Sequence, residues 1–146
     1  MLAKVAQVKG RRSKDIWLAL ALLSAAACQR PPEQHREPEV VWRRLGSWSG
    51  NGNTQTESFI FESGALRVRW ETRNERSGHV GTFKLVLQSA VSGRQLAVAA
   101  DQRGVGKGES LVSEPPHQAY VLIESTDVDW SFTVDEGVIG TTPGPS

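Results

Sequence analysis

Apolar and polar residues alternate along three stretches of this 146-residue chain, and no other feature restricts its fold as strongly. The stretches read LRVRWE at 66–71, TFKLVLQ at 82–88, with one exception at Val86, and WSFTV at 130–134. A period of two places alternate side chains on opposite faces of an extended strand, whereas an amphipathic helix repeats every three to four residues. We therefore predict half-buried β-strands at these three places.

Further apolar runs bring the expected total to about eight short strands. These runs lie at 40–45, 58–61, 94–100, 110–113 and 119–124. Turn signals separate the strands: GNGN at 50–53, ESG at 62–64, NERSG at 74–78, SG at 92–93, RGVGKG at 103–108 and EPP at 114–116. With no helical segment between them, such strands are typical of a single antiparallel β-sandwich or jelly roll. We also expect a tight hairpin on Ser92 and Gly93, because a Gly-containing pair between apolar runs suits a two-residue turn.

The N-terminal region has the order of a secretory signal peptide, with five basic residues, an apolar run at 16–23 and small residues at 24–27. The only cysteine of the chain, Cys28, follows directly. AAAC at 25–28 resembles the lipobox of bacterial lipoproteins, although Ala25 stands where Leu is favoured. The resemblance implies that Cys28 receives a diacylglyceryl group and becomes the acylated first residue of the mature protein. Ala25 to Ala27 also fit a general signal-peptidase site, which would leave a secreted protein with an unused thiol.

This reading divides the chain into a signal peptide at 1–27, a lipid-anchored disordered tether at 28–39, a β-sandwich at 40–136 and a flexible tail at 137–146. The tether sequence is rich in proline and charge and lacks aliphatic and aromatic residues. Acyl chains on Cys28 would hold the domain on a membrane. That membrane would be the outer membrane of a two-membrane bacterium, or the outer face of the plasma membrane otherwise.

Charge argues against nucleic acid as a partner. From Cys28 onward the chain has 12 basic and 15 acidic residues, a balance of −3. Nucleic-acid binding draws its affinity mainly from basic side chains that neutralise phosphates. We expect the partner to be an envelope protein or a glycan instead.

Four segments resemble a widespread group of small secreted or lipid-anchored bacterial β-sandwich proteins. They are GNGNTQTESF at 50–59, LRVRWE at 66–71, GTFKLVLQSA at 81–90 and YVLIESTDVDWSFTV at 120–134. The resemblance implies a sandwich fold and no particular activity, since many members are uncharacterised.

Catalytic motifs are incomplete in this sequence. Gly106 and Lys107 are followed by Gly108, where a phosphate-binding loop needs Ser or Thr. GSWSG at 46–50 places Trp48 where a hydrolase needs its serine nucleophile. The two histidines of the domain, His79 and His117, are far apart in the chain. We predict a non-catalytic protein without a cofactor.

Three groups of side chains remain as binding candidates. Trp48, with Asn51 and Asn53, would form a sugar-binding rim through stacking and amide hydrogen bonds, or Trp48 would instead fold back to close one end of the sandwich. Asp127 and Asp129 are candidate calcium ligands, or else polar residues of a turn. Trp70 and Trp130 share faces with aliphatic residues and are expected in the core.

Arg67 and Arg69, followed by Arg73 and Arg76, form a basic edge that is either a solvated ion-pair face or a contact for anionic head groups or an acidic glycan. The predicted function is therefore a cell-envelope lipoprotein that presents a binding module of unknown ligand. Its two alternatives are a glycan-binding module using the Trp48 loop and a structural subunit of an envelope complex.

Overall fold

The computed structural model describes residues 38–76 and 78–140, and it places them in nine β-strands and no helix. The strands are β1 (Glu39–Asn51), β2 (Thr54–Gln55), β3 (Phe59–Phe61), β4 (Ala65–Arg73), β5 (Thr82–Ser89), β6 (Gln95–Arg103), β7 (Gly106–Ser113), β8 (His117–Thr126) and β9 (Asp129–Gly140). Within these residues there is consequently no helix able to cross a membrane. Cys28, the predicted signal peptide and residues 28–37 of the predicted tether lie outside the described residues.

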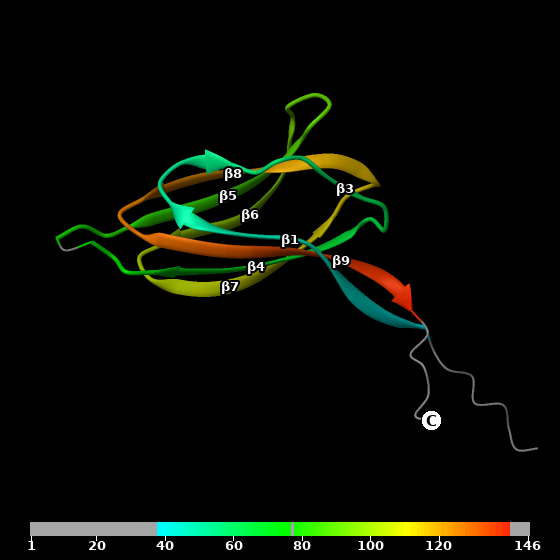
Figure 1. Ribbon diagram of the computed structural model, residues 1–146, viewed down its shortest axis with the longest axis horizontal. Coiled ribbons are helices and arrows are strands. Elements are labelled where there is room, and N and C mark those ends of the chain that lie inside the picture. The colour runs from blue at the N-terminus through cyan, green and yellow to red at the C-terminus, as the bar shows by residue number, and fades with distance from the viewer. Residues whose placement is uncertain (1–37, 77, 141–146) are drawn as a thin grey trace, which may run out of the picture. The chain divides into compact units, whose positions relative to one another are not determined.

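Two antiparallel sheets form the layers of a sandwich (Figure 1). The four-stranded sheet has the order β1-β9-β4-β7, and the five-stranded sheet has the order β2-β8-β5-β6, with β3 also paired to β8. This confirms the prediction of an all-β antiparallel sandwich. Each of the eight predicted strands is present, and the two-residue β2 is an addition.

Strands β5 and β6 form the predicted hairpin. Among the described strands, they are the only two that follow each other in the chain and also pair. Its turn is longer than the two residues expected, because β5 ends at Ser89 and β6 begins at Gln95. The Ser89 amide donates to the Arg94 carbonyl at 2.8 Å, and the Gly93 amide donates to the Ser89 carbonyl at 2.8 Å. Gly93 has φ +71°, a conformation that favours glycine.

The prediction of a loop around Trp48 is wrong. Strand β1 runs through this segment and ends only at Asn51. The cause is a β-bulge between Arg44 and Gly46, which shifts the pairing with β9 by one residue. The bulge interrupts the alternation of apolar residues, so no strand pattern is visible in the sequence there.

The predicted start of the flexible tail is also wrong. Gly137 to Gly140, at the end of β9, pair with β1 and belong to the sandwich.

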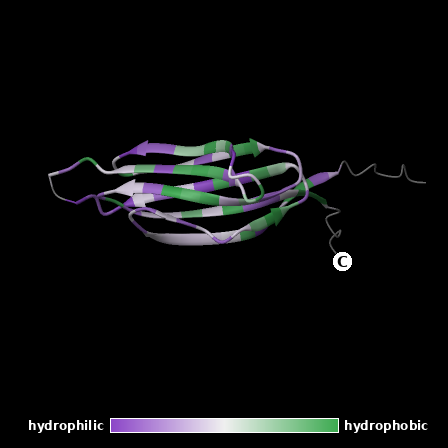
Figure 2. Ribbon diagram, turned by 90° about the horizontal axis from the view of Figure 1, so that it is seen from above, coloured by the Kyte–Doolittle hydropathy of each residue, from purple (hydrophilic) through white to green (hydrophobic). Residues whose placement is uncertain are grey.

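The core lies between the inner faces of the two sheets, where Figure 2 shows hydrophobic residues gathered along the strands. The five-stranded sheet contributes mostly aliphatic side chains and a few phenylalanines, whereas the four-stranded sheet contributes aliphatic side chains together with every tryptophan of the core cluster. Rings meet across the interior: Phe83 lies 5.9 Å from Trp70 and 6.3 Å from Trp130 between centroids. Trp130 is thus buried in the core as predicted, and Trp70, which is partly exposed, packs against the core.

Each tryptophan of residues 38–140 lies against a glycine backbone. Trp42, Trp70 and Trp130 are cross-strand partners of Gly137, Gly108 and Gly50, and Trp48 covers Gly46 on its own strand. A Cβ added to Gly46 or Gly108 would approach the neighbouring indole to 2.1 or 2.5 Å. Glycine is therefore needed at these places to admit the rings.

A buried carboxylate on β9 joins β1 and the turn before β4 through hydrogen bonds. Glu136, which has no exposed surface, accepts hydrogen bonds from the amides of Glu62 and Ser63 and from Arg43. Burial acts to raise the pKa of Glu136, but the hydrogen bonds and the charge of Arg43 outweigh it and hold the pKa below its ordinary value.

Candidate functional site

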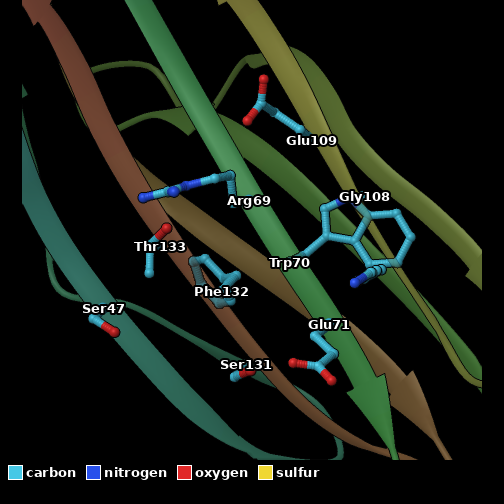
Figure 3. A pocket seen from close by; sticks show the side chains of 10 residues that line it. Ser47, Arg69, Trp70, Glu71, Gly108, Glu109, Ser131, Phe132 and Thr133 are labelled. Atoms are coloured by element: carbon cyan, nitrogen blue, oxygen red, sulfur yellow. The ribbon is translucent and has the colours of Figure 1, made fainter. Parts of the chain in front are cut away.

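The outer face of the four-stranded sheet is hollowed into a depression of about 610 Å³ that reaches across all four strands (Figure 3). Hydroxyl and charged residues dominate its lining, and they alternate along the strands with the core-facing Trp70, Gly108 and Phe132. The lining residues are Ser47, Arg69, Trp70, Glu71, Lys107, Gly108, Glu109, Ser131, Phe132 and Thr133.

Strand register explains the shape of this groove. Directly opposed residues of antiparallel strands point to the same face. Ser47 of β1 is opposite Thr133 of β9, and Thr133 is in turn opposite Arg69 of β4, which faces Glu109 of β7. Short hydroxyl side chains on β1 and β9 thus lie beside long charged side chains on β4 and β7.

The next rung repeats this arrangement with the charges reversed. Ser131 of β9 is opposite Glu71 of β4, and Glu71 is opposite Lys107 of β7. Across the two rungs, the two basic and two acidic side chains balance. Within the described residues, Glu71, Lys107 and Glu109 have no side-chain hydrogen bond or ion pair, so these polar groups are available to a ligand.

An arginine cluster adjoins the groove through Arg69. Asp135 of β9, only 2% exposed, accepts hydrogen bonds from Arg44 of β1 and from Arg67 and Arg69 of β4. The Nη2 atoms of Arg67 and Arg69 lie 3.1 and 3.0 Å from Asp135 Oδ2. The Arg67 guanidinium also stacks 4.4 Å from the centroid of the Trp42 ring, a cation–π contact that fixes it in place.

Electrostatics keep Asp135 ionised. Burial acts to raise its pKa, but hydrogen bonds from Arg44 and Arg67 and the charges of Arg44 and Arg69 outweigh it, so the pKa lies below its ordinary value. Three cations therefore surround one carboxylate that is ionised at neutral pH.

Thr133 is a second unusual group in the groove. Its Oγ1 is buried and has no hydrogen-bond partner in the described part of the chain. Figure 3 shows the Arg69 side chain extending from β4 toward β9, next to Thr133. Because Thr133 Oγ1 has almost no exposed surface, the hydrogen-bond donors that a ligand would meet at this point are those of the exposed Arg69 side chain.

The predicted Trp48, Asn51 and Asn53 do not share one surface. Trp48 faces inward, stacks on Phe132 with centroids 5.1 Å apart, and is only partly exposed. Asn51 follows on the other face of β1, in register with Asp129, and Asn53 accepts a 2.8 Å hydrogen bond from the Ser125 amide. This placement matches the alternative in which Trp48 closes part of the sandwich, and sugar binding by these three residues stays a prediction.

Of the predicted calcium residues, Asp127 lies in the turn between β8 and β9, and Asp129 is the first residue of β9. Asp127 has φ +55°, and its carbonyl accepts from the Arg76 amide at 2.9 Å. The Asp129 carboxylate accepts from Asn74 at 2.9 Å and Arg76 at 3.3 Å. Among residues 38–76 and 78–140, no three His, Cys, Asp or Glu side chains gather as a metal site.

One histidine does meet a serine. His117 Nε2 lies 2.6 Å from Ser89 Oγ, a distance found in Ser–His dyads. Ser89 is only 1% exposed, however, and its Oγ already accepts from the amides of Val91 and Ser92 at 3.3 and 3.2 Å. The pair thus supports the β5–β6 turn and does not present a nucleophile to solvent.

Sequence reasoning identified Arg67 and Arg69 but missed their partners. Arg44 precedes the bulge in β1, and Asp135 lies on β9, about 65 to 90 residues away in the chain. Alternation did place Asp135 on the outward side of its strand. Nothing in a single sequence indicates that β1 and β4 flank β9.

No protein-family model and no curated protein matches this sequence. Among solved structures, the chain is similar to the CBM22-1 and GH10 modules of xylanase 10B from Clostridium thermocellum in complex with xylohexaose, at 16% identity and a TM-score of 0.39, over 72% of this chain and 27% of that chain. It is also similar to two structures of infectious bursal disease virus, both at a TM-score of 0.34, with 13% and 12% identity, over 75% of this chain and 36% and 35% of theirs. This chain thus covers less than two thirds of each of these chains. At TM-scores this low, none of these likenesses bears on function.

Proposed function

We propose that this protein is a non-catalytic, lipid-anchored binding protein of the bacterial cell envelope, and that the groove on the four-stranded sheet binds a carbohydrate chain. The observation that carries the proposal is the composition of the groove, in which hydroxyl groups and unpaired charged groups line one continuous depression. Sugars present hydroxyl groups that both donate and accept, so a mixed lining of this kind can satisfy them.

Anchoring through Cys28 is the part of the proposal that concerns location. The signal-like N-terminus and the small residues before Cys28 support it. Mass spectrometry of the mature N-terminus tests it: an acylated Cys28 is expected, and an unmodified Cys28 or another first residue would contradict it.

Binding is tested by screening the full chain against soluble polysaccharides and repeating the measurement with Ser131→Trp. Ser131 is a short side chain of the groove, and an indole at this position would fill the space that a sugar needs. Gln118→Trp is the matched control, since Gln118 is exposed on β8 of the other sheet. We expect binding by the wild type and the control, with loss of binding in Ser131→Trp.

Two results would contradict this site. Equal binding by Ser131→Trp and the wild type would place the carbohydrate elsewhere, with the Trp48 region as the next candidate. Failure to bind any polysaccharide, together with co-purification of one protein partner, would favour the alternative of a subunit in an envelope complex.

A further inference from the structure

We infer that the arginine cluster of Arg44, Arg67 and Arg69 around Asp135 is an anion-binding subsite, and that the ligand of the groove is a carboxylate-bearing glycan. This inference rests on the proposed function, because it specifies which carbohydrates the same groove selects.

The first argument is the balance of charge. Three guanidinium groups oppose a single carboxylate, which leaves a local charge of +2. In the adjoining rungs Glu71 faces Lys107 and balances it, whereas Glu109 faces Arg69 and offsets one of the three arginines, so the cluster and the rungs together carry a net charge of +1. The excess of positive charge is therefore confined to the end of the groove where β1, β9 and β4 meet.

The second argument is the number of hydrogen-bond donors. Three guanidinium groups carry about fifteen N–H donors, whereas one carboxylate offers about four lone-pair sites. Asp135 can thus occupy only a fraction of them. Arginine is also the side chain whose planar fork suits bidentate recognition of a carboxylate.

The third argument is a division of roles within the cluster. The Arg67 side chain is 20% exposed and stacked on Trp42, so it is held against Asp135. The Arg44 and Arg69 side chains are 48% and 44% exposed, so they offer their remaining donors to solvent. Arg69 additionally lines the groove, which connects the cluster to the carbohydrate site.

Calorimetric titration of the full chain with two polymers tests the inference: polygalacturonate, which carries a carboxylate on each sugar, and uncharged hydroxyethyl cellulose. We expect tighter binding of polygalacturonate, and we expect added salt to weaken that binding because it screens exposed charges. Arg44→Gln and Arg69→Gln should each weaken it about tenfold, the effect of one lost charge-assisted hydrogen bond. Lys84→Gln, with the same change of charge on the outer face of the other sheet, should have no effect.

The outcomes separate the two proposals. Equal, salt-independent binding of both polymers would overturn the anion subsite and leave carbohydrate binding intact. Binding of neither polymer, together with no binding in the wider polysaccharide screen, would overturn both. Binding only to vesicles of phosphatidylglycerol and phosphatidylcholine would overturn the glycan assignment in favour of a lipid head group. The polymer comparison uses the wild type, so it holds even where a variant fails to fold.

Discussion

The two sheets each bury one outward-pointing residue on a central strand, and they do so with opposite chemistry. On β5 of the five-stranded sheet, Val86 is 4% exposed between its cross-strand partners Val98 and Leu122. On β9 of the four-stranded sheet, Asp135 is 2% exposed beneath its arginines. An outward position on a central strand is therefore covered by its neighbours, and their chemistry decides whether that face is a packing surface or a polar site.

Removal of the Asp135 carboxylate should cause the largest loss of stability on either face. Asp135→Ala leaves three neighbouring cations without their shared acceptor, so we expect a loss of about 3 kcal/mol in the free energy of unfolding. Urea denaturation measures it. The control Glu124→Ala removes an exposed carboxylate from β8 on the other sheet, and a change within about 0.5 kcal/mol is expected. Similar losses in both variants would mean that the arginine cluster adds nothing to stability.

The second largest effect is expected from low pH, which should destabilise the polar face of the four-stranded sheet and leave the apolar face of the five-stranded sheet unaffected. The pKa values of Asp135 and Glu136 are lowered in the folded protein, so their stabilisation is complete above the ordinary carboxyl pKa and is lost as pH falls through the lowered values. We expect the free energy of unfolding to decrease below about pH 4. Urea denaturation at a series of pH values measures this, and Asp135→Asn should show a shallower decrease. An unchanged slope in that variant would contradict the role of Asp135.

Truncation of Val86 tests the apolar face. Val86→Ala removes two methyl groups from a covered site, and we expect a loss of about 1 to 2 kcal/mol. Because neighbouring Val98 and Leu122 carry no charge, this loss should be the same at pH 4 and at neutral pH, unlike that of Asp135→Ala. A loss that depends on pH would show that the two faces are coupled.

The smallest expected effect concerns Thr133. Thr133→Val replaces a buried hydroxyl that has no hydrogen-bond partner with a methyl group, so we expect unchanged stability or a gain of up to about 1 kcal/mol. Thr82→Val on the other sheet is the matched control, since Thr82 Oγ1 lies 2.7 Å from Thr126 Oγ1 and this hydrogen bond would be lost. Thermal unfolding of both variants compares them. A clear destabilisation by Thr133→Val would indicate that its hydroxyl has a partner in solution.

The sequence predicts the sandwich well because alternation is a local property. The strands around Val68, Leu85 and Phe132 follow from their own residues, as do turns such as Gly64 and Gly78, both of which have positive φ. The extent of β1 was missed because a bulge and two inward glycines, Gly46 and Gly50, remove the apolar signal just where Trp48 enters the core.

The candidate site was only half predictable. Arg67 and Arg69 share a strand, and their common face follows from the period of two. Arg44 and Asp135 join them through the order of strands in the sheet, which depends on pairings between residues about 65 to 90 positions apart. The sequence instead directed attention to Trp48, because a tryptophan among small polar residues resembles an exposed aromatic.

The placement of the described tryptophans, each against a glycine and all on one sheet, also has a spectroscopic consequence. Within residues 38–140, the tryptophans belong to β1, β4 and β9, and the five-stranded sheet has none, while Tyr120 lies on β8 of that sheet. Indole emission from this domain consequently reports the contact between the sheets, where Trp70 and Trp130 pack near Phe83. Phenol absorbance reports the five-stranded sheet, where the Tyr120 hydroxyl donates to Gln88. Separation of the two sheets should therefore change the indole emission, and fraying of β8 from β5 should change the phenol absorbance, with no label attached to the protein.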